Sequence, residues 1–316
     1  MRRALVVGSA AVFVALGFVF ACGGDDTSAG GQSTPDAAPG VDSSSPKVDS
    51  SVPGKDSSVD TTDAADAAPP AYTPAVLGTR IVLWLEGDSF KEVDGGALWP
   101  DKSGTGNNAS QDTPARTPVL IDAGSEGGIN GHGVVHFAGN EFLRIADNTS
   151  LQWATSDFAF YVVMRHHNGP VAGGGLPPDN AIVYTKWTNT DPEYPGFFMW
   201  ASYPGSTGYV TRLQVSEALK SDSGLNDGDM RLVGARRSGA NFELRVGGNK
   251  VDSISDASIP DADQFNAPGL PAFIGGREAA IQQLQGDVAE IIAVKGGLSD
   301  LEQTTLEGYL KKKYGL

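Results

Sequence analysis

The amino-acid sequence predicts an all-β fold, a sandwich of two antiparallel sheets with a short helix at the C-terminus. Three observations lead to this prediction. Runs of β-branched and aromatic residues alternate with a period of two, which is typical of strands. Gly, Asn, Asp and Pro separate these runs at short intervals. Within residues 73–316, the helix signals are confined to residues 299–316.

Eight runs are the clearest predicted strands. In the run 242–246, Phe242, Leu244 and Val246 face one way, while Glu243 and Arg245 face the other. The turn-rich connection 237–241 joins this run to the one before it, which predicts a hairpin. The eight runs are 80–85, 158–164, 181–185, 197–200, 210–215, 230–236, 242–246 and 273–275.

The predicted C-terminal helix begins at a capping box, in which the Ser299 hydroxyl and the Glu302 carboxylate satisfy first-turn amides. Three lysines, 311–313, lie where the helix carbonyls are negative, and Gly315 can end the helix. The apolar side is expected to consist of Leu301, Leu306, Tyr309 and Leu310.

Residues 1–21 read as an export signal. Arg2 and Arg3 precede an uncharged run from Ala4 to Ala21. The run ends in Val19-Phe20-Ala21-Cys22-Gly23, which resembles the lipobox of bacterial lipoproteins. The resemblance implies cleavage after Ala21, acylation of Cys22 and, because Gly23 is not Asp, a place at the outer membrane.

Residues 22–72 are expected to form a disordered tether after the lipidated cysteine. Residues 23–72 hold nine Asp against two Lys, with no Trp or Phe, so the segment cannot bury enough apolar surface to fold. Residues 73–316 hold all five Trp and form the predicted folded domain. The domains are therefore 1–21, 22–72 and 73–316.

The charge and the cysteine count exclude several function classes. The net charge of −15 argues against nucleic acid, whose phosphates require clusters of Lys and Arg. Because Cys22 is the only cysteine, internal disulfides and zinc-thiolate sites are excluded. The membrane is expected to be contacted through the N-terminal lipid only.

Four segments together resemble the laminin-G-like or concanavalin-A-like lectin/glucanase family, over roughly residues 80–316. The resemblance implies a jelly-roll sandwich, a fold that serves both binding modules and glycosidases. The fourth segment is the most specific, since strand, capped helix and terminal Tyr-Gly follow one another as in the family. The segments are the strand 81–85 with Trp99-Pro100-Asp101-Lys102-Ser103-Gly104, then 131–143, 225–248 and 286–315. Asp101 is expected to hydrogen-bond nearby backbone amides.

No catalytic pattern is found, so the chain is predicted not to be an enzyme. Family glucanases use two carboxylates on one strand face, whereas the odd spacing of Asp287 and Glu290 predicts opposite faces. The four histidines are interpreted as ordinary strand or loop residues. The first pair, on one strand face, lacks a third ligand, and the second pair, adjacent in sequence, would point to opposite faces. The pairs are His132 with His136 and His166 with His167.

Calcium is the one cofactor considered. Asp222, Asp227 and Asp229 lie in a single loop of hard oxygen ligands, which fits either a Ca²⁺ site or an ordinary Asp-Gly turn. The spacing does not match an EF-hand.

Two loops have the composition of a sugar site, where a ring packs on the apolar face of a pyranose and polar groups bond its hydroxyls. Candidate ligand-binding residues are Trp187, Asn189, Asp191, Tyr194 and Tyr203. Trp84 and Trp200 are expected in the core. The leading hypothesis is a surface-tethered, non-catalytic module for a polysaccharide or glycoprotein. The alternatives are an adhesion or structural lipoprotein that binds a protein partner, and a diverged glycoside hydrolase.

Overall fold

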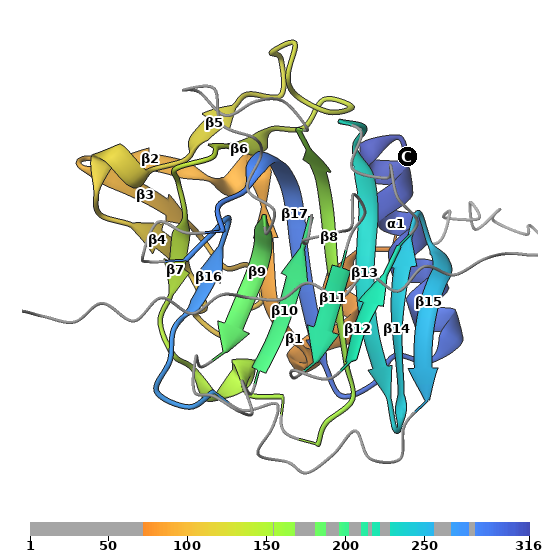
Figure 1. Cartoon of the computed structure of the whole chain (residues 1–316). Coiled ribbons are helices and arrows are strands. Elements are labelled where there is room, and N and C mark those ends of the chain that lie inside the picture. The colour runs from red at the N-terminus through yellow and green to blue at the C-terminus, as the bar shows by residue number, and fades with distance from the viewer. Residues whose placement is uncertain are drawn as a thin grey trace, which may run out of the picture. The chain divides into compact units, whose positions relative to one another are not determined.

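The computed structural model describes residues 72–153, 155–167, 181–187, 196–201, 210–213, 217–221, 228–255, 267–277 and 282–316. They belong to one compact unit and form two antiparallel sheets that lie face to face, with one α-helix (Figure 1). The predicted all-β sandwich is thus confirmed. No helix within these ranges combines the length and the apolar composition needed to cross a membrane.

The first sheet has eight strands in the order β15-β14-β13-β8-β17-β6-β5, and β1 also pairs with β17. Its central strands, β8 and β17, are its longest and are almost wholly buried. The strands are β1 (Ile81–Glu86), β5 (Val119–Ile121), β6 (Val134–Ala138), β8 (Phe158–His166), β13 (Arg231–Ser238), β14 (Asn241–Val246), β15 (Asn249–Ser255) and β17 (Gln285–Lys295).

The second sheet has nine strands in the order β12-β11-β10-β9-β16-β7-β4-β3-β2. All of its neighbouring strands are antiparallel. The strands are β2 (Lys91–Val93), β3 (Gly96–Trp99), β4 (Ala109–Gln111), β7 (Leu143–Ile145), β9 (Ile182–Trp187), β10 (Gly196–Trp200), β11 (Val210–Leu213), β12 (Glu217–Lys220) and β16 (Ala272–Ile274). Short 3₁₀ turns are η1 (Pro74–Arg80), η2 (Gly87–Ser89), η3 (Pro114–Arg116) and η4 (Thr149–Leu151).

The main core lies between the sheets and is rich in aromatic rings. Phe158 and Phe160 of β8 pack against Phe197 of β10 with ring centroids 5.3 and 5.4 Å apart. Trp153 stacks on Phe158 at 4.9 Å. The alternation noted in the sequence is therefore the alternation between this core and the outer faces of the sheets.

A second apolar cluster lies between the outer face of the first sheet and the helix α1 (Asp300–Tyr314). Leu306, Leu310 and Tyr314 of α1 are buried there. Full burial of a large apolar side chain stabilises a fold by about 1.5–3 kcal/mol relative to its exposure to water. Trp84 is also buried in this cluster. Leu301 was expected on the apolar side, but 77% of it is exposed, because at about 100° per residue it lies on the helix face opposite the buried Leu306 and Leu310.

The ends of α1 follow the sequence prediction. Ser299 accepts a hydrogen bond from the Glu302 amide and the Glu302 carboxylate accepts from the Ser299 amide, which completes the capping box. Gly315 ends the helix in the left-handed conformation, with φ of 69°.

Asp101 fixes the loop after β3, as expected. Its carboxylate accepts hydrogen bonds from the amides of Trp84, Ser103 and Asn107, each at 2.9 Å. This ties the loop to the middle of β1.

Strand β17 changes partner along its length. Its first part, up to Val288, pairs with β6, and its second part, from Glu290, pairs with β1. A β-bulge at Ala289 marks the change, because the register to β8 shifts between Val288 and Glu290. The bulge alters which side chains share the outer face of the first sheet.

The signal sequence, Cys22 and the tether up to residue 71 lie outside the described residues. Tyr72, the last residue of the predicted tether, is described and packs against Tyr309 of α1, with ring centroids 5.9 Å apart. The predicted boundaries 1–21, 22–72 and 73–316 stay predictions.

Candidate functional site

The outer face of the second sheet carries an aromatic cluster around Trp187. On β10, Phe197 and Met199 point into the core between the sheets, so Phe198 and Trp200 point outward. Phe198 lies opposite Thr185 of β9, and Trp187, two residues further, shares this face. Trp187 is the half-buried member of the cluster, whereas Phe198 and Trp200 are buried.

The Trp187 indole is held on two sides. Its ring meets Phe198 edge-on, with centroids 4.8 Å apart. The guanidinium carbon of Arg277 lies 4.7 Å from the centre of the same ring, which is a cation–π contact. The expected ligand-binding residue is therefore positioned by both strands of the β9–β10 pair and by the segment after β16.

Arg277 carries a charge without an acidic partner in the described part of the chain. Its Nη1 donates a hydrogen bond to the Gln282 side chain at 3.3 Å. Burial lowers the pKa of Arg277, yet a guanidinium stays charged at neutral pH. A half-buried cation beside a half-buried indole is an arrangement that can accept an anionic, partly apolar ligand.

The other four predicted sugar contacts lie outside the described residues. They are Asn189, Asp191, Tyr194 and Tyr203.

Two of the three predicted calcium ligands, Asp222 and Asp227, also lie outside the described residues. Asp229 is described; 77% of its side chain is exposed and its carboxylate lies 3.5 Å from Arg231 Nη2. The calcium site stays a prediction.

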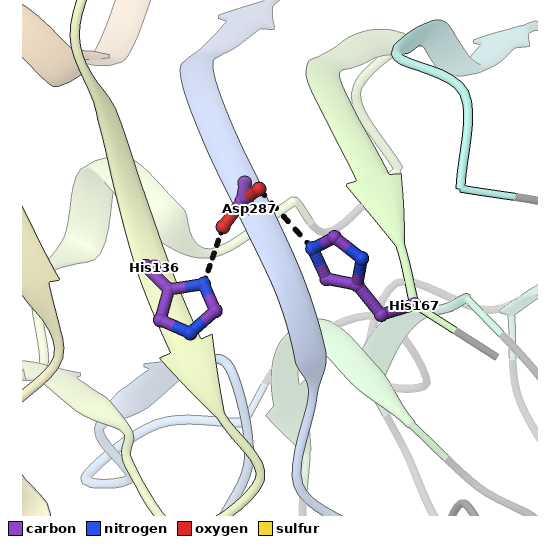
Figure 2. A group of neighbouring side chains, drawn as sticks. All are labelled: His136, His167 and Asp287. Carbon is purple, nitrogen blue, oxygen red and sulfur yellow. Dashed lines mark hydrogen bonds and ion pairs between the residues drawn. The ribbon is translucent and has the colours of Figure 1, made fainter. Parts of the chain in front are cut away.

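A second group of polar side chains lies on the outer face of the first sheet. It consists of His136 on β6, Asp287 on β17 and His167 directly after β8. The His136 Nδ1 lies 2.6 Å from Asp287 Oδ1, and the His167 Nε2 lies 3.2 Å from Asp287 Oδ2. Figure 2 shows the two imidazole rings on either side of Asp287, each turning one nitrogen toward its carboxylate.

The backbone brings these three residues together. Asp287 is paired with His136 on one side and with Arg165 on the other. At Gly286 a Cβ would lie 2.2 Å from the carbonyl oxygen of Arg165, so only glycine permits this approach of β17 to β8.

Asp287 is a buried anion that is fully compensated. Its side chain is 1% exposed, and Arg165 Nε also bonds its Oδ2. Burial alone would raise the pKa of Asp287, but hydrogen bonds from His136, His167 and Arg165 outweigh burial and hold its pKa far below the ordinary value. The hydrogen bond to Asp287 in turn raises the pKa of His136.

Sequence reasoning treated these histidines as ordinary because it paired them along the chain. His132 instead lies 2.7 Å from Asp88, away from the set. His166 is buried and His167 faces the other way, as their adjacency on a strand predicts. A usable signal was present: Asp287 and Glu290 interrupt the apolar run of the central strand β17, and a buried carboxylate requires partners.

The structure also brings two carboxylates together, Glu86 and Glu290, which face each other in the β1–β17 register. The bulge at Ala289 turns Glu290 toward the helix, so Asp287 and Glu290 both lie on the outer face of the first sheet. The expectation that their odd spacing separates them onto opposite faces is therefore wrong. Periodicity predicts faces only in a regular strand.

The Glu86–Glu290 pair is held by cations and hydrogen-bond donors. Lys313 Nζ lies 2.8 Å from Glu86 and 2.7 Å from Glu290, and Lys102 also bonds Glu86. Trp84 Nε1 and the Tyr314 hydroxyl each donate to Glu290 at 2.8 Å. The Glu290 side chain is 0% exposed, so this pair has the geometry of a buried ion network under the end of α1.

Burial and the lysines shift the pKa values of the two carboxyl groups in opposite directions. Burial raises the pKa of Glu290 above its ordinary value. For Glu86, burial has the same tendency, but hydrogen bonds from Lys102 and Lys313 outweigh it and the pKa is lowered. A pair with separated pKa values resembles an acid and base, but a substrate would have to displace Lys313 and the helix end to reach Glu290.

No protein-family model and no curated protein sequence matches the chain. Among solved structures, the binding domain of Paraclostridial Mosquitocidal Protein 1 is similar with a TM-score of 0.50 and 15% identity, over 75% of this chain and 53% of that one. Trypanosoma rangeli sialidase in complex with sialic acid also has a TM-score of 0.50, with 11% identity over 74% of this chain and 33% of that one. The chain thus spans about half and one third of these structures, and at such identity the likeness concerns the fold.

Proposed function

We propose that this chain is a non-catalytic glycan-binding module and that Trp187 and Arg277 contact its ligand. The ligand class that fits these two residues is an acidic glycan. A lipid on Cys22 and the tether 22–72 would hold the module at the bacterial cell envelope, at the outer membrane.

The observation that carries this proposal is the Trp187–Arg277 contact of 4.7 Å on the outer face of the second sheet. An indole supplies flat apolar surface for the C–H face of a sugar ring, while a guanidinium supplies paired donors for a carboxylate. Since Arg277 forms no ion pair within the described residues, a sugar carboxylate would compensate a charge that the protein itself leaves uncompensated there.

The fold likeness supports the same ligand class. One similar structure is a binding domain, and the other is a sialidase in complex with sialic acid, which is an acidic sugar. The fold alone does not choose a function, so the weight of the proposal rests on the two side chains.

The carboxylate network argues for binding over hydrolysis. Retaining and inverting glycosidases both need two carboxyl groups that reach the glycosidic bond. Within the described part of the chain, Glu86 and Glu290 are the carboxylate pair that the β1–β17 register brings together, and Lys313 bonds both of them. This supports the non-catalytic reading of the chain.

A glycan array tests the proposal. The chain from residue 22, carrying Cys22→Ser to keep it soluble, would be applied with calcium and again with EDTA. We expect saturable binding to glycans that carry sialic or uronic acids, and its loss in Trp187→Ala. Tyr309→Ala is the matched control, because Tyr309 is a half-buried aromatic residue on α1, across the sandwich.

Three results would revise the proposal. Binding that Tyr309→Ala weakens as much as Trp187→Ala would remove Trp187 from the site. Loss of binding in EDTA would direct attention to the Asp222–Asp229 loop. An array that is blank under both conditions would overturn the glycan proposal and favour a protein partner.

A further inference from the structure

The set of His136, His167 and Asp287 has the composition of a metal site. One ligand atom from each residue lies within 4.8 Å of the other two. Two imidazole nitrogens and a carboxylate oxygen form a borderline donor set, which suits zinc and similar divalent transition ions better than calcium or magnesium.

The three side chains must draw together around one ion. With bonds of about 2.0–2.1 Å, ligand atoms around a tetrahedral ion lie about 3.3 Å apart. The His136 Nδ1 lies 2.6 Å from Asp287 Oδ1 and the His167 Nε2 lies 3.2 Å from Asp287 Oδ2, so each imidazole already faces the carboxylate, through a different oxygen. The three ligand atoms lie within 4.8 Å of one another, so the wider separations must close by up to about 1.5 Å when an ion binds.

The surroundings orient the carboxylate and leave access for an ion. Arg165 bonds Asp287 through Nε and donates from Nη2 to the Gly127 carbonyl oxygen at 2.9 Å. Such partners commonly orient metal-ligating carboxylates. The side chains of His136 and His167 are 32% and 37% exposed, so an ion can approach from solvent and a fourth position remains for water or a ligand.

We propose that His136, His167 and Asp287 bind a divalent transition ion of the zinc class, with three protein ligands and one open position. This site is on the outer face of the first sheet and is independent of the proposed glycan contact on the second.

Calorimetric titration of the full chain with Zn²⁺ tests the site, with Ca²⁺ in excess throughout to saturate the aspartates of the tether. We expect one saturable Zn²⁺ site per chain and an increase in melting temperature on binding. His136→Gln and His167→Gln should each weaken binding by at least about tenfold and abolish the temperature increase.

His132→Gln is the matched control, because His132 Nδ1 also contacts an aspartate, Asp88 at 2.7 Å, and the described residues offer this pair no third metal ligand. It should leave Zn²⁺ binding unchanged. The histidine variants are preferred to Asp287→Asn, which would leave Arg165 unpaired beside a buried position and could unfold the chain for that reason alone. Melting without metal confirms that each variant is folded.

Co²⁺ provides a second readout, since its visible absorption reports tetrahedral coordination by nitrogen and oxygen. We expect this band in the wild type and in His132→Gln, and its absence in the other two variants. Absence of saturable Zn²⁺ binding to the wild type would overturn the proposal. So would binding that survives in both His136→Gln and His167→Gln.

Discussion

Lys313 and Glu290 form an ion pair of 2.7 Å in which the glutamate side chain is completely buried. Lys313 lies in the last turn of α1, and Glu290 lies at the bulge of the central strand β17. The same ammonium reaches Glu86 on β1 at 2.8 Å. One lysine therefore fastens the end of the helix to two strands whose carboxylates would otherwise repel each other.

Lys313→Met should destabilise the fold by about 3–5 kcal/mol, because it leaves a buried carboxylate without its cation. Chemical denaturation at neutral pH measures the free energy of unfolding. Lys312→Met is the control, since Lys312 is the exposed neighbour on the same helix turn and should change stability by less than about 0.5 kcal/mol. Equal effects of the two substitutions would show that the network contributes nothing specific.

The N-terminus of α1 should make stability depend on acid pH. The hydrogen bond from Arg80 and the capping hydrogen bonds from Ser299 lower the pKa of Glu302 from 4.5 to about 2. Because the folded pKa is the lower one, the unfolded chain binds the proton first. The contribution of Glu302 is therefore complete above pH 4.5 and is lost as the pH falls toward 2.

Glu302→Gln tests this dependence and preserves the length of the capping side chain. Unfolding free energies measured from about pH 6 to about pH 2 should fall less steeply in the variant than in the wild type. Since the side chains of Arg80 and Glu302 are each about one-third exposed, added salt should reduce the difference between the wild type and the variant. Parallel curves for the two proteins would contradict the assignment.

Arg277→Gln should selectively weaken binding of acidic glycans. Removal of the guanidinium eliminates the charge that would pair with a sugar carboxylate, while the Trp187 surface remains. Neutral glycans should be bound as before, and the salt dependence of acidic-glycan binding should decrease. Lys312→Gln on α1 is the control, because it makes the same change in net charge, and it should leave acidic-glycan binding unchanged. Equal weakening by Lys312→Gln would show that binding depends on the overall charge of the protein.

Cys22→Ser should release the protein from the membrane. The wild type should incorporate labelled palmitate in a bacterial host and partition into detergent, because each buried methylene contributes about 0.8 kcal/mol. The serine variant should partition into the aqueous phase. Detergent partitioning that survives the substitution would favour an uncleaved apolar segment, Ala4 to Ala21, as the anchor.

Much of the local structure was predictable. The predicted hairpin of residues 230–236 and 242–246 corresponds to β13 and β14, and the capping box from Ser299 to Glu302 begins α1. The hairpin and the cap depend on residues a few positions apart, so a single sequence reveals them. Trp187 was chosen from composition; it ends β9 beside Arg277, and its role as a ligand contact stays a prediction.

The sequence by itself determined the eight clearest strands, where the helix begins and ends, and which large side chains are available for a core. Tertiary structure decided which polar groups meet. His136, His167 and Asp287 come from segments up to 151 residues apart, and Glu86 meets Glu290 only in the β1–β17 register. The bulge at Ala289 then moves Glu290 to the face of Asp287. Alternation specifies a strand's two faces, but long-range pairing and bulges set which neighbours share a face, and neither is encoded locally.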